Sequence, residues 1–254
     1  MPDRKACVGV DGCRAGWVAV SGSRPDDLSL SVFPSFGDLV AGLPAAAIAV
    51  DMPIGLPDRI AGGGRAPEKA VRPMLGQRQS SVFAIPGRAA VEMGSLITGK
   101  AGEDRALHAK ISALAKTLSG PPKGLSIQAF YLFPKILEID GLLCEDAALR
   151  TIVKESHPEV AFTVLNGGSA MTLPKKIKGR VNPAGMEERR ALLARYGVSA
   201  SFLTPKPPSG VGEDDVLDAS VCWLVAERLT RGAAVCHPDT PEHDRHGLEV
   251  AIWA

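Results

Sequence analysis

Two aspartates at the ends of apolar segments are the residues best placed to do chemistry. Asp11 follows the apolar run 6–10 and Asp51 follows the run 45–50, and a turn-forming glycine or proline comes soon after each. If both runs are neighbouring strands, the two carboxylates lie in one crevice at the C-terminal edge of a sheet, where α/β proteins usually bind ligands. Two carboxylates that close together repel each other unless a cation or a proton lies between them. The alternative is that each aspartate caps its own turn through its side chain.

A second acidic group opens the helix expected over 213–230. Residues 213–215 fall in its first turn, where the helix dipole favours acidic side chains. Asp218 lies three residues after Asp215 and on the same helix face, at a position where the dipole no longer accounts for an aspartate. Together with the two strand-end aspartates, Asp215 and Asp218 predict a site for a hard divalent cation, Mg²⁺ or Mn²⁺ rather than zinc.

Further candidates lie between these acidic groups. Glu155, in the segment VKESHPEV, is an additional candidate catalytic carboxylate, for which a solvated strand end is the alternative. Guanidinium, hydroxyl and ammonium groups are typical contacts of phosphorylated substrates. The candidate substrate contacts of this kind are Arg14, Arg78, Ser80, Ser81, Lys135 and Lys175. For the two lysines, a solvated or snorkelling surface side chain is the alternative.

The composition describes an ordinary globular protein. Its 254 residues, 45% of them hydrophobic, suffice for one large domain with a substantial core. With 29 basic and 28 acidic residues the net charge is +1, which argues against binding nucleic acid through bulk electrostatics but not through a local patch. The start of the chain lacks the apolar stretch of a signal peptide, and no segment approaches the roughly 18 apolar residues of a membrane span. Five scattered cysteines form no CxxC pair, so we expect neither a disulfide framework nor a thiolate zinc site, and a cytoplasmic location.

The elements that must position these residues read as a mixed α/β fold. Apolar runs predict strands over 6–10, 17–21, 28–33 and 45–50, with a helix over 36–43 that Ser35 caps. This order suggests a mixed sheet with the first and fourth strands side by side in its centre. The segment 58–88 is rich in Gly, Pro and Arg and is expected to be irregular with one short helix. The remaining expectations are helices over 96–119, 126–140 (kinked or broken at Pro134), 183–196 and 213–230, strands over 151–160 and 248–253, and a hydrophilic tail around Cys236, His237, His243 and His246.

Several blocks of the sequence resemble a known family. VGVDGCRAGW, IAVDMPIGLPD, SSVFAIPGR, SIQAFYLFPKILEID, ESHPEVAF, LPKKIKGR and EDDVLDA occur in this order, nearly from one end of the chain to the other. They are similar to the domain-of-unknown-function family 429, a group of predicted nucleases with a ribonuclease H-like fold. The resemblance implies a single domain over 1–254, with a five-stranded mixed sheet, flanking helices and a large, partly helical insertion over about 58–145 after the fourth strand.

The resemblance also assigns roles to the acidic residues. Ribonuclease H and Holliday-junction resolvases carry one acid on the first strand, one on the fourth and one or two on a late helix. These positions fall here on Asp11, Asp51, Asp215 and Asp218. The implied reaction is hydrolysis of a phosphodiester with two divalent ions, Mg²⁺ or Mn²⁺, that Asp11 bridges, and nucleic acid is the implied substrate.

Two other kinds of protein remain open on the sequence alone. One is a phosphotransferase or ATPase-like enzyme acting on a small phosphorylated substrate, although neither a Walker loop nor a duplicated half is present. The other is a non-catalytic interaction protein that keeps the fold and binds a partner through its basic loop. The long insertion could also cover the crevice and favour a small nucleotide-like substrate over a duplex. Nothing in the sequence indicates an oligomeric state.

Overall fold

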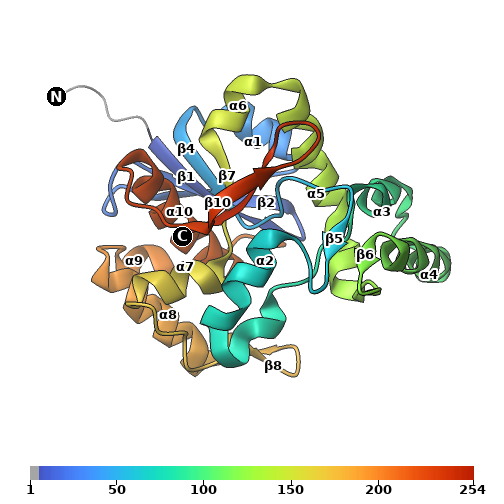
Figure 1. Ribbon diagram of the computed structural model, residues 1–254. Coiled ribbons are helices and arrows are strands. Elements are labelled where there is room, and N and C mark those ends of the chain that lie inside the picture. Colours follow the sequence, from blue (N-terminus) through green and yellow to red (C-terminus); the bar gives the residue numbers. More distant parts are fainter. Residues whose placement is uncertain (1–5) are drawn as a thin grey trace.

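A five-stranded mixed sheet forms the centre of the molecule in the computed structural model, which describes residues 6–254 (Figure 1). Its strands, in order across the sheet, are β3 (Ser29–Phe33), β2 (Gly16–Gly22), β1 (Ala6–Cys13), β4 (Ala45–Val50) and β7 (Val153–Glu155). β2 pairs antiparallel with β1 and β3, whereas β4 pairs parallel with β1 and β7. The first and fourth strands are therefore neighbours, as predicted. Residues 1–5, at the start of the segment expected to lack a signal peptide, lie outside the described part.

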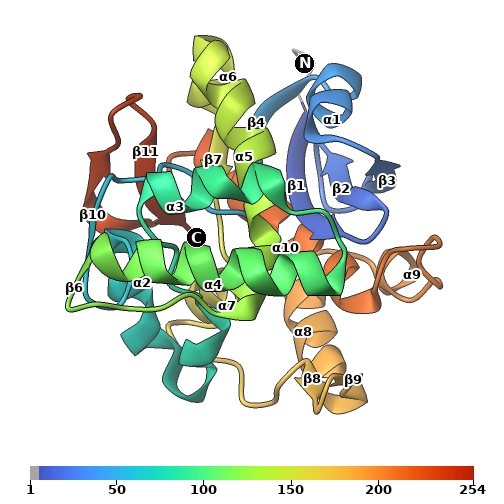
Figure 2. The same ribbon diagram turned by 90° about the vertical axis from the view of Figure 1, so that its right-hand side faces the viewer.

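Alternation along the strands divides the core into two layers. Val8 and Val10 of β1 face one side and pack with α1 (Phe36–Gly42) and α5 (Ile127–Glu145). Cys7 and Cys13 face the other side, where α7 (Pro158–Leu165) and α10 (Glu213–Thr230) cover the sheet. Figure 2 looks onto the first of these layers, with α5 running past the strands. Helices on both faces of a mixed sheet are consistent with the ribonuclease H-like fold.

The segment between β4 and β7 is more regular than the sequence predicted. Its further elements are β5 (Ile60–Ala61), α2 (Ala66–Val71), the 3₁₀ helices η1 (Arg72–Ser81) and η2 (Met93–Leu96), α3 (Arg88–Glu92), α4 (Ala101–Thr117), β6 (Ser119–Gly120) and α6 (Ala147–Ile152). The expectation of a single short helix within 58–88 is wrong, because α2 continues directly into η1. The helix predicted from residue 96 begins only at Ala101, after Gly99 adopts a φ of 77°.

Helix α5 ties this insertion to the core. Ser126 caps it by accepting a hydrogen bond from the backbone N–H of Ala129, and the helix continues through Pro134 to Glu145. Phe133 and Ile136 of α5 pack in the same cluster as the β1 valines. The last part of the 58–145 segment therefore belongs to the central layer structure.

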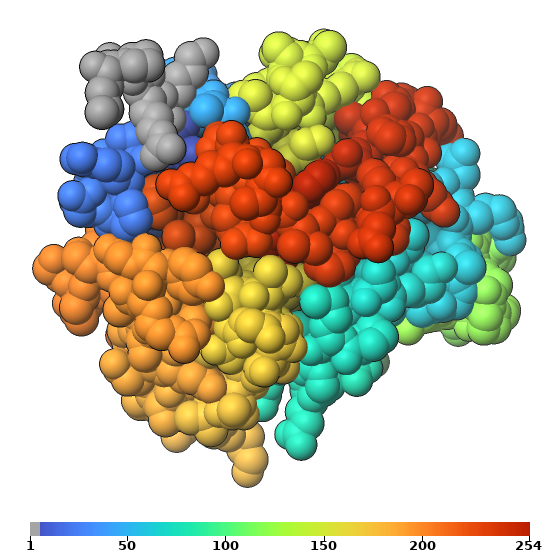
Figure 3. Space-filling model, turned by 60° about the vertical axis from the view of Figure 1, so that its left-hand side comes forward, coloured from blue at the N-terminus to red at the C-terminus, as the bar shows by residue number. Residues whose placement is uncertain are grey.

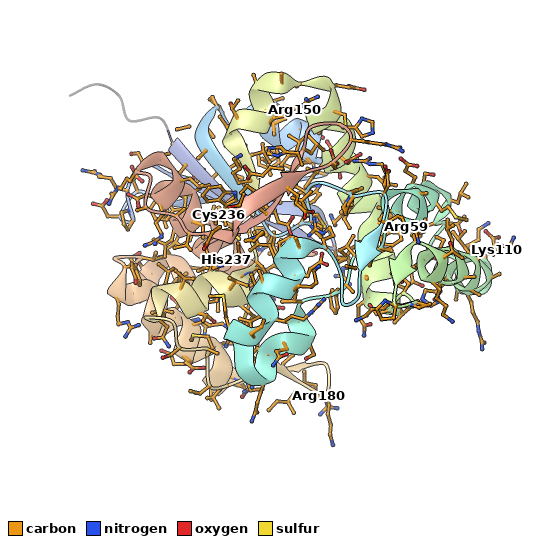
Figure 4. The ribbon with its side chains drawn as sticks, in the orientation of Figure 1. Arg59, Lys110, Arg150, Arg180, Cys236 and His237 are labelled. Atoms are coloured by element: carbon orange, nitrogen blue, oxygen red, sulfur yellow. The ribbon has the colours of Figure 1, made fainter. Side chains whose placement is uncertain are left out.

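The chain after β7 contains two corrections. The strand predicted over 151–160 is wrong, because only Val153–Glu155 is a strand. Asp146 caps the helix before it, and Pro158 occupies the first turn of the helix after it. The prediction of a hydrophilic tail around Cys236 is also wrong. Cys236 and His237 lie in β10 (Cys236–His243), which pairs with the predicted terminal strand, β11 (Glu249–Trp253) (Figure 4).

The remaining elements follow α7 and lie on the same side of the sheet. They are the hairpin of β8 (Lys176–Ile177) and β9 (Arg180–Val181), then α8 (Pro183–Arg195) and α9 (Ala200–Leu203), which lead into α10. Among residues 6–254, no helix combines the length and the apolar character that crossing a membrane requires.

Candidate metal centre and its two chambers

Three aspartates from distant parts of the chain meet at the C-terminal edge of the central strands. They are Asp11, Asp51 and Asp218. Each offers one carboxylate oxygen, and the three oxygens all lie within 4.8 Å of one another. Asp11 has the same strand parity as Cys7 and Cys13, so it faces α10, which carries Asp218. The backbone N–H of Asp51 donates to the Val10 carbonyl over 2.9 Å and extends the β1–β4 ladder by one step, which brings its side chain beside Asp11.

Burial and mutual repulsion make the ionised cluster costly. Asp11 and Asp218 are only 8% and 4% exposed. Burial, followed by the neighbouring charges of Asp51 and Asp218, raises the pKa of Asp11 well above its usual value. Burial is also the main reason why the pKa of Asp51 and that of Asp218 are each raised to about 7, and Lys175 opposes both shifts. A bound cation would remove this cost.

One oxygen of the cluster has an unused bonding position. Asp218 Oδ1 is buried and has no hydrogen-bond partner among residues 6–254. A buried acceptor left without a partner is unfavourable and calls for an explanation such as an ion. Three carboxylates are the hard oxygen donors that Mg²⁺ and Mn²⁺ prefer. The residues present therefore fit a divalent cation.

A lysine is built into the same cluster. Lys175 Nζ contacts Asp218 Oδ2 directly and lies 4.0 Å from Glu159 Oε1. The loop that carries Lys175 is held in place, because its carbonyl accepts the Asn182 N–H at 2.7 Å. Although burial opposes its charge, the carboxylates of Asp218 and Glu159 raise the pKa of Lys175. It is a fixed cation of the site.

Asp215 lies at the margin of the cluster. Its Oδ2 accepts the backbone N–H of Gly212 at 2.8 Å and so caps α10. Burial raises its pKa, and the cap hydrogen bond opposes that shift. Asp214 forms a salt bridge of 2.5 Å with Lys176 and is not one of the three residues whose oxygens converge. The structure thus brings together Asp11, Asp51 and Asp218, with Asp215 nearby in a capping role.

Glu155 belongs to a separate buried network. The strand register pairs it with Val50 rather than Asp51, so it points to the opposite face of the sheet from the three aspartates. There it receives hydrogen bonds from Arg65, at 2.7 and 3.1 Å, and from the Ile54 N–H at 2.7 Å. Arg65 also pairs with Glu68 at 2.6 Å. Although burial opposes the charge of Arg65, the two glutamates raise its pKa.

Two cavities meet at the aspartate cluster. We call the first the apolar chamber: it has about 230 Å³, and its walls include the apolar side chains of Met52, Phe83, Ile85, Tyr131 and Leu132. Asp11 and Asp51 lie at its inner end, and the ring of Tyr131 is 50% exposed. Lys135 also lines it and donates to the Gly16 carbonyl at 2.5 Å, with its ammonium 4.2 Å from the centre of the Trp17 ring.

The second cavity, which we call the basic chamber, has about 290 Å³. Its cationic walls are Arg78, Lys175, Lys176 and Arg189, and it shares Asp51, Ser81 and His157 with the apolar chamber. In Figure 3, α7 is flanked by α8 and by the α2–η1 segment, the region whose residues line this chamber. Ser80 lines it as well. Arg14, in contrast, is exposed in the turn between β1 and β2 and lines neither chamber.

The cations of the basic chamber differ in how they are paired. Arg189 holds Glu159 with two hydrogen bonds of 2.7 and 2.8 Å from Nη2. Arg78 donates only to the Thr172 carbonyl, over 3.4 Å, and its buried Nε has no partner among the described residues. No carboxylate within residues 6–254 forms a salt bridge with it, so Arg78 is the cation most available to an anionic ligand.

His157 lines the site, although its sequence context predicted no definite role for it. It lines both chambers, its Nε2 lies 3.3 Å from the Ser81 carbonyl, and its buried Nδ1 has no partner in the described chain. Because a carbonyl only accepts, Nε2 carries the hydrogen and Nδ1 presents a lone pair. Burial lowers the pKa of this imidazole, which keeps it neutral. The ESHPEV motif marks His157 as a residue of interest, but it does not predict the contact with the Ser81 carbonyl that orients the ring.

The comparisons with known proteins agree with the resemblance of the sequence blocks. No curated protein and no solved structure has a significant match to this chain. A family model described as "Protein of unknown function (DUF429)" matches residues 9–243, nearly the whole chain, and the protein therefore belongs to that family.

Proposed function

We propose that the protein is a divalent-metal-dependent phosphodiester hydrolase, a nuclease in the broad sense. The observation that carries the proposal is the convergence of three aspartate oxygens within 4.8 Å. Two of the residues, Asp11 and Asp218, are buried, and Asp218 has an unpartnered oxygen. Asp11, Asp51 and Asp218 would hold Mg²⁺ or Mn²⁺. A divalent ion there would act as a Lewis acid on a phosphoryl oxygen.

The surrounding side chains have separate tasks in this proposal. Lys175 holds the Asp218 carboxylate and keeps a positive charge where negative charge develops on a transferring phosphoryl group. His157 offers a neutral Nδ1 as a proton acceptor for a water or hydroxyl group that enters from either chamber. Asp215 fixes the first turn of α10 and thereby the position of Asp218.

The charge of the cluster favours one ion over the two that the resemblance implies. Three carboxylates and the ammonium of Lys175 leave two negative charges, which a single divalent ion neutralises. A second ion would have to displace Lys175 from Asp218. A two-ion site therefore requires a movement of the 172–182 loop.

We also propose a cytoplasmic location. Four of the cysteines, Cys13, Cys144, Cys222 and Cys236, are free thiols, as expected in a reducing compartment. A non-catalytic interaction protein is the main alternative function, and metal binding separates it from an enzyme.

Calorimetric titration of Mn²⁺ tests the proposed function. The wild type should bind Mn²⁺ saturably and hydrolyse bis(p-nitrophenyl) phosphate with it, and the double variant Asp11→Asn, Asp218→Asn should lose both. The matched control is Asp214→Asn, on the same helix turn but paired with Lys176 outside the cluster, which should keep both. Absence of Mn²⁺ binding to the wild type, or equal binding to the double variant, would sink the metal site. Binding without hydrolysis of any phosphodiester would favour the non-catalytic alternative.

A further inference from the structure

The two chambers differ in chemical character although they meet at the same three residues. The apolar chamber has apolar and aromatic walls and ends at the acidic cluster, whereas the basic chamber has four cationic side chains among those that line it. A ligand that spans both must be apolar at one end and anionic at the other. Its middle must lie beside Asp51, Ser81 and His157.

The size of the chambers limits that ligand. Volumes of about 230 and 290 Å³ are each below the range of about 300–1,000 Å³ that is typical of small-molecule sites, and only together do they fall within it. Two of the three carboxylates are nearly covered, since Asp11 is 8% and Asp218 4% exposed. The paired bases of a rigid duplex stay stacked inside the helix and cannot enter the apolar chamber, so a duplex cannot occupy both chambers.

The apolar chamber suits a flat ring more than a group that needs specific hydrogen bonds. Tyr131 is half-exposed at its wall, and Phe83 also lines it. Its polar side chains are largely occupied: Arg65 and Glu155 bond to each other, and Ser156 Oγ donates to the Trp253 carbonyl at 2.9 Å. A nucleobase could stack there with little readout of its edges, which is how proteins bind unpaired bases without sequence preference.

The basic chamber suits the anionic part of the same ligand. Arg78 has a buried Nε without a partner among the described residues and no salt bridge to hold it. It joins two covering segments, because it comes from η1 and donates to the Thr172 carbonyl of the 172–182 loop. A guanidinium in this state is suited to a phosphate oxygen.

We infer that the two chambers together bind one nucleotide unit of an unpaired phosphodiester. Its base lies in the apolar chamber against Tyr131, and its phosphate lies at the junction beside Asp51, with an oxygen toward Arg78 of the basic chamber. A continuing ester arm would extend further into the basic chamber. The substrate class is then a small nucleotide diester or the end of a single strand, not a duplex. This inference rests on the proposed function and deepens it.

Binding of adenosine 5′-monophosphate in the presence of Mn²⁺ tests the inference without turnover, since this probe contains no diester. Ribose 5-phosphate, which lacks the base, should bind about ten-fold more weakly, in line with the stacking of one base. A blunt twelve-base-pair DNA duplex should bind more weakly than the mononucleotide. Tighter binding of the duplex, or equal binding of the two monophosphates, would overturn the inference.

Variants locate the two ends of the ligand. Tyr131→Ala should weaken binding of the monophosphate about ten-fold while leaving that of ribose 5-phosphate unchanged, and Tyr131→Phe should restore it because stacking needs the ring and not the hydroxyl. Arg78→Gln should weaken both about ten-fold, as expected for a lost charged hydrogen bond. The matched control Arg180→Gln removes the same charge from β9, where Arg180 is exposed and lines neither chamber (Figure 4), and it should change the binding of neither monophosphate. Equal effects of Arg78→Gln and Arg180→Gln would contradict the assigned chamber.

Binding of a single-stranded hexanucleotide distinguishes the two possible ligands, the end of a single strand and a free small nucleotide. If it binds at least as tightly as the monophosphate, the strand continues through the basic chamber and the ligand is a strand end. Weaker binding identifies a free small nucleotide. Mn²⁺ binding without base-dependent binding would remove only this inference, whereas base-dependent binding without Mn²⁺ binding would remove only the metal-dependent function.

Discussion

Gly9 of β1 lies directly beneath Trp223 of α10, so closely that no side chain fits between them. A Cβ added to Gly9 would come within 2.0 Å of the backbone nitrogen of Trp223 and 2.1 Å of the Ala219 carbonyl. This contact sets the depth of α10 over the sheet. Asp218 comes one residue before Ala219 on the helix, and Asp11 comes two residues after Gly9 on the strand, and their carboxylates meet within 4.8 Å. The spacing of the acidic cluster thus depends on a glycine that takes no part in it.

Replacing this glycine should therefore damage both the fold and the site. Gly9→Ala forces α10 away from β1, and we expect a loss of about 3 kcal/mol or more of unfolding free energy in urea, together with weaker Mn²⁺ binding. The control Gly102→Ala lies in α4, where an added Cβ meets nothing within 4 Å, and should be neutral or stabilising. A Gly9→Ala protein as stable as the wild type would show that the helix can shift at little cost.

Lys175 should compete with metal for the acidic cluster. Lys175→Met removes a positive charge in contact with Asp218, and we expect the Mn²⁺ affinity to rise at least ten-fold, about 1.4 kcal/mol, with the calorimetric stoichiometry moving from one toward two. Lys176→Met, which removes the neighbouring ammonium paired with Asp214, is the control and should leave both values unchanged. Two Mn²⁺ ions bound to the wild type would contradict the single-ion charge balance.

The metal-free protein should lose stability as the pH rises. Burial raises the pKa of Asp51 and that of Asp218 from 3.8 to about 7, so between these values the folded chain holds protons that the unfolded chain has released. Unfolding free energy therefore falls with increasing pH from about 4 to about 7. Urea unfolding in EDTA at several pH values, for the wild type and for Asp51→Asn, isolates this contribution. The difference between the two proteins should change across that window, and adding Mn²⁺ above pH 7 should stabilise only the wild type. A constant difference would exclude the raised pKa.

Glu155 should prove to be a stability residue. Glu155→Gln leaves the buried Arg65 without one of its two carboxylate partners, and breaking a buried pair costs about 3–5 kcal/mol. Unfolding in urea measures this loss, while Mn²⁺ affinity below the unfolding transition should stay within about two-fold. Glu103→Gln, in an exposed pair with Lys100, is the control and should cost less than about 1 kcal/mol. Loss of Mn²⁺ binding with unchanged stability would instead return Glu155 to the active site.

Local patterns were enough to find the centre of the fold and the core of the site. The apolar runs before Asp11 and Asp51 are buried strands, and parallel pairing of such strands brings their ends to one edge. The acidic pattern of the C-terminal helix pointed to Asp218, because an aspartate beyond the first turn lacks a local explanation. Both inferences depend on residues close together in sequence.

The parts that the sequence could not predict depend on distant contacts. The basic loop predicts Lys175 as a contact for substrate, but not its contact with Asp218, 43 residues further along the chain, which depends on how that loop packs on α8. Glu155 looked like a site acid, but a register shift of one residue relative to Asp51 sends it to the other face. The prediction of a strand over 151–160 was wrong for a different reason. The strand there has only three residues, too few to show a periodic pattern.

The order of the acidic residues along the chain has a consequence for how the protein is made. Asp11 and Asp51 are synthesised before α10, which carries the third carboxylate, and Gly9 is covered only when that helix packs on β1. A growing chain therefore carries two repelling aspartates on an incomplete core until residues 213–230 have been added. Premature termination anywhere upstream yields a fragment without the third aspartate, so the proposed cleavage of a phosphodiester would report that translation had run past α10.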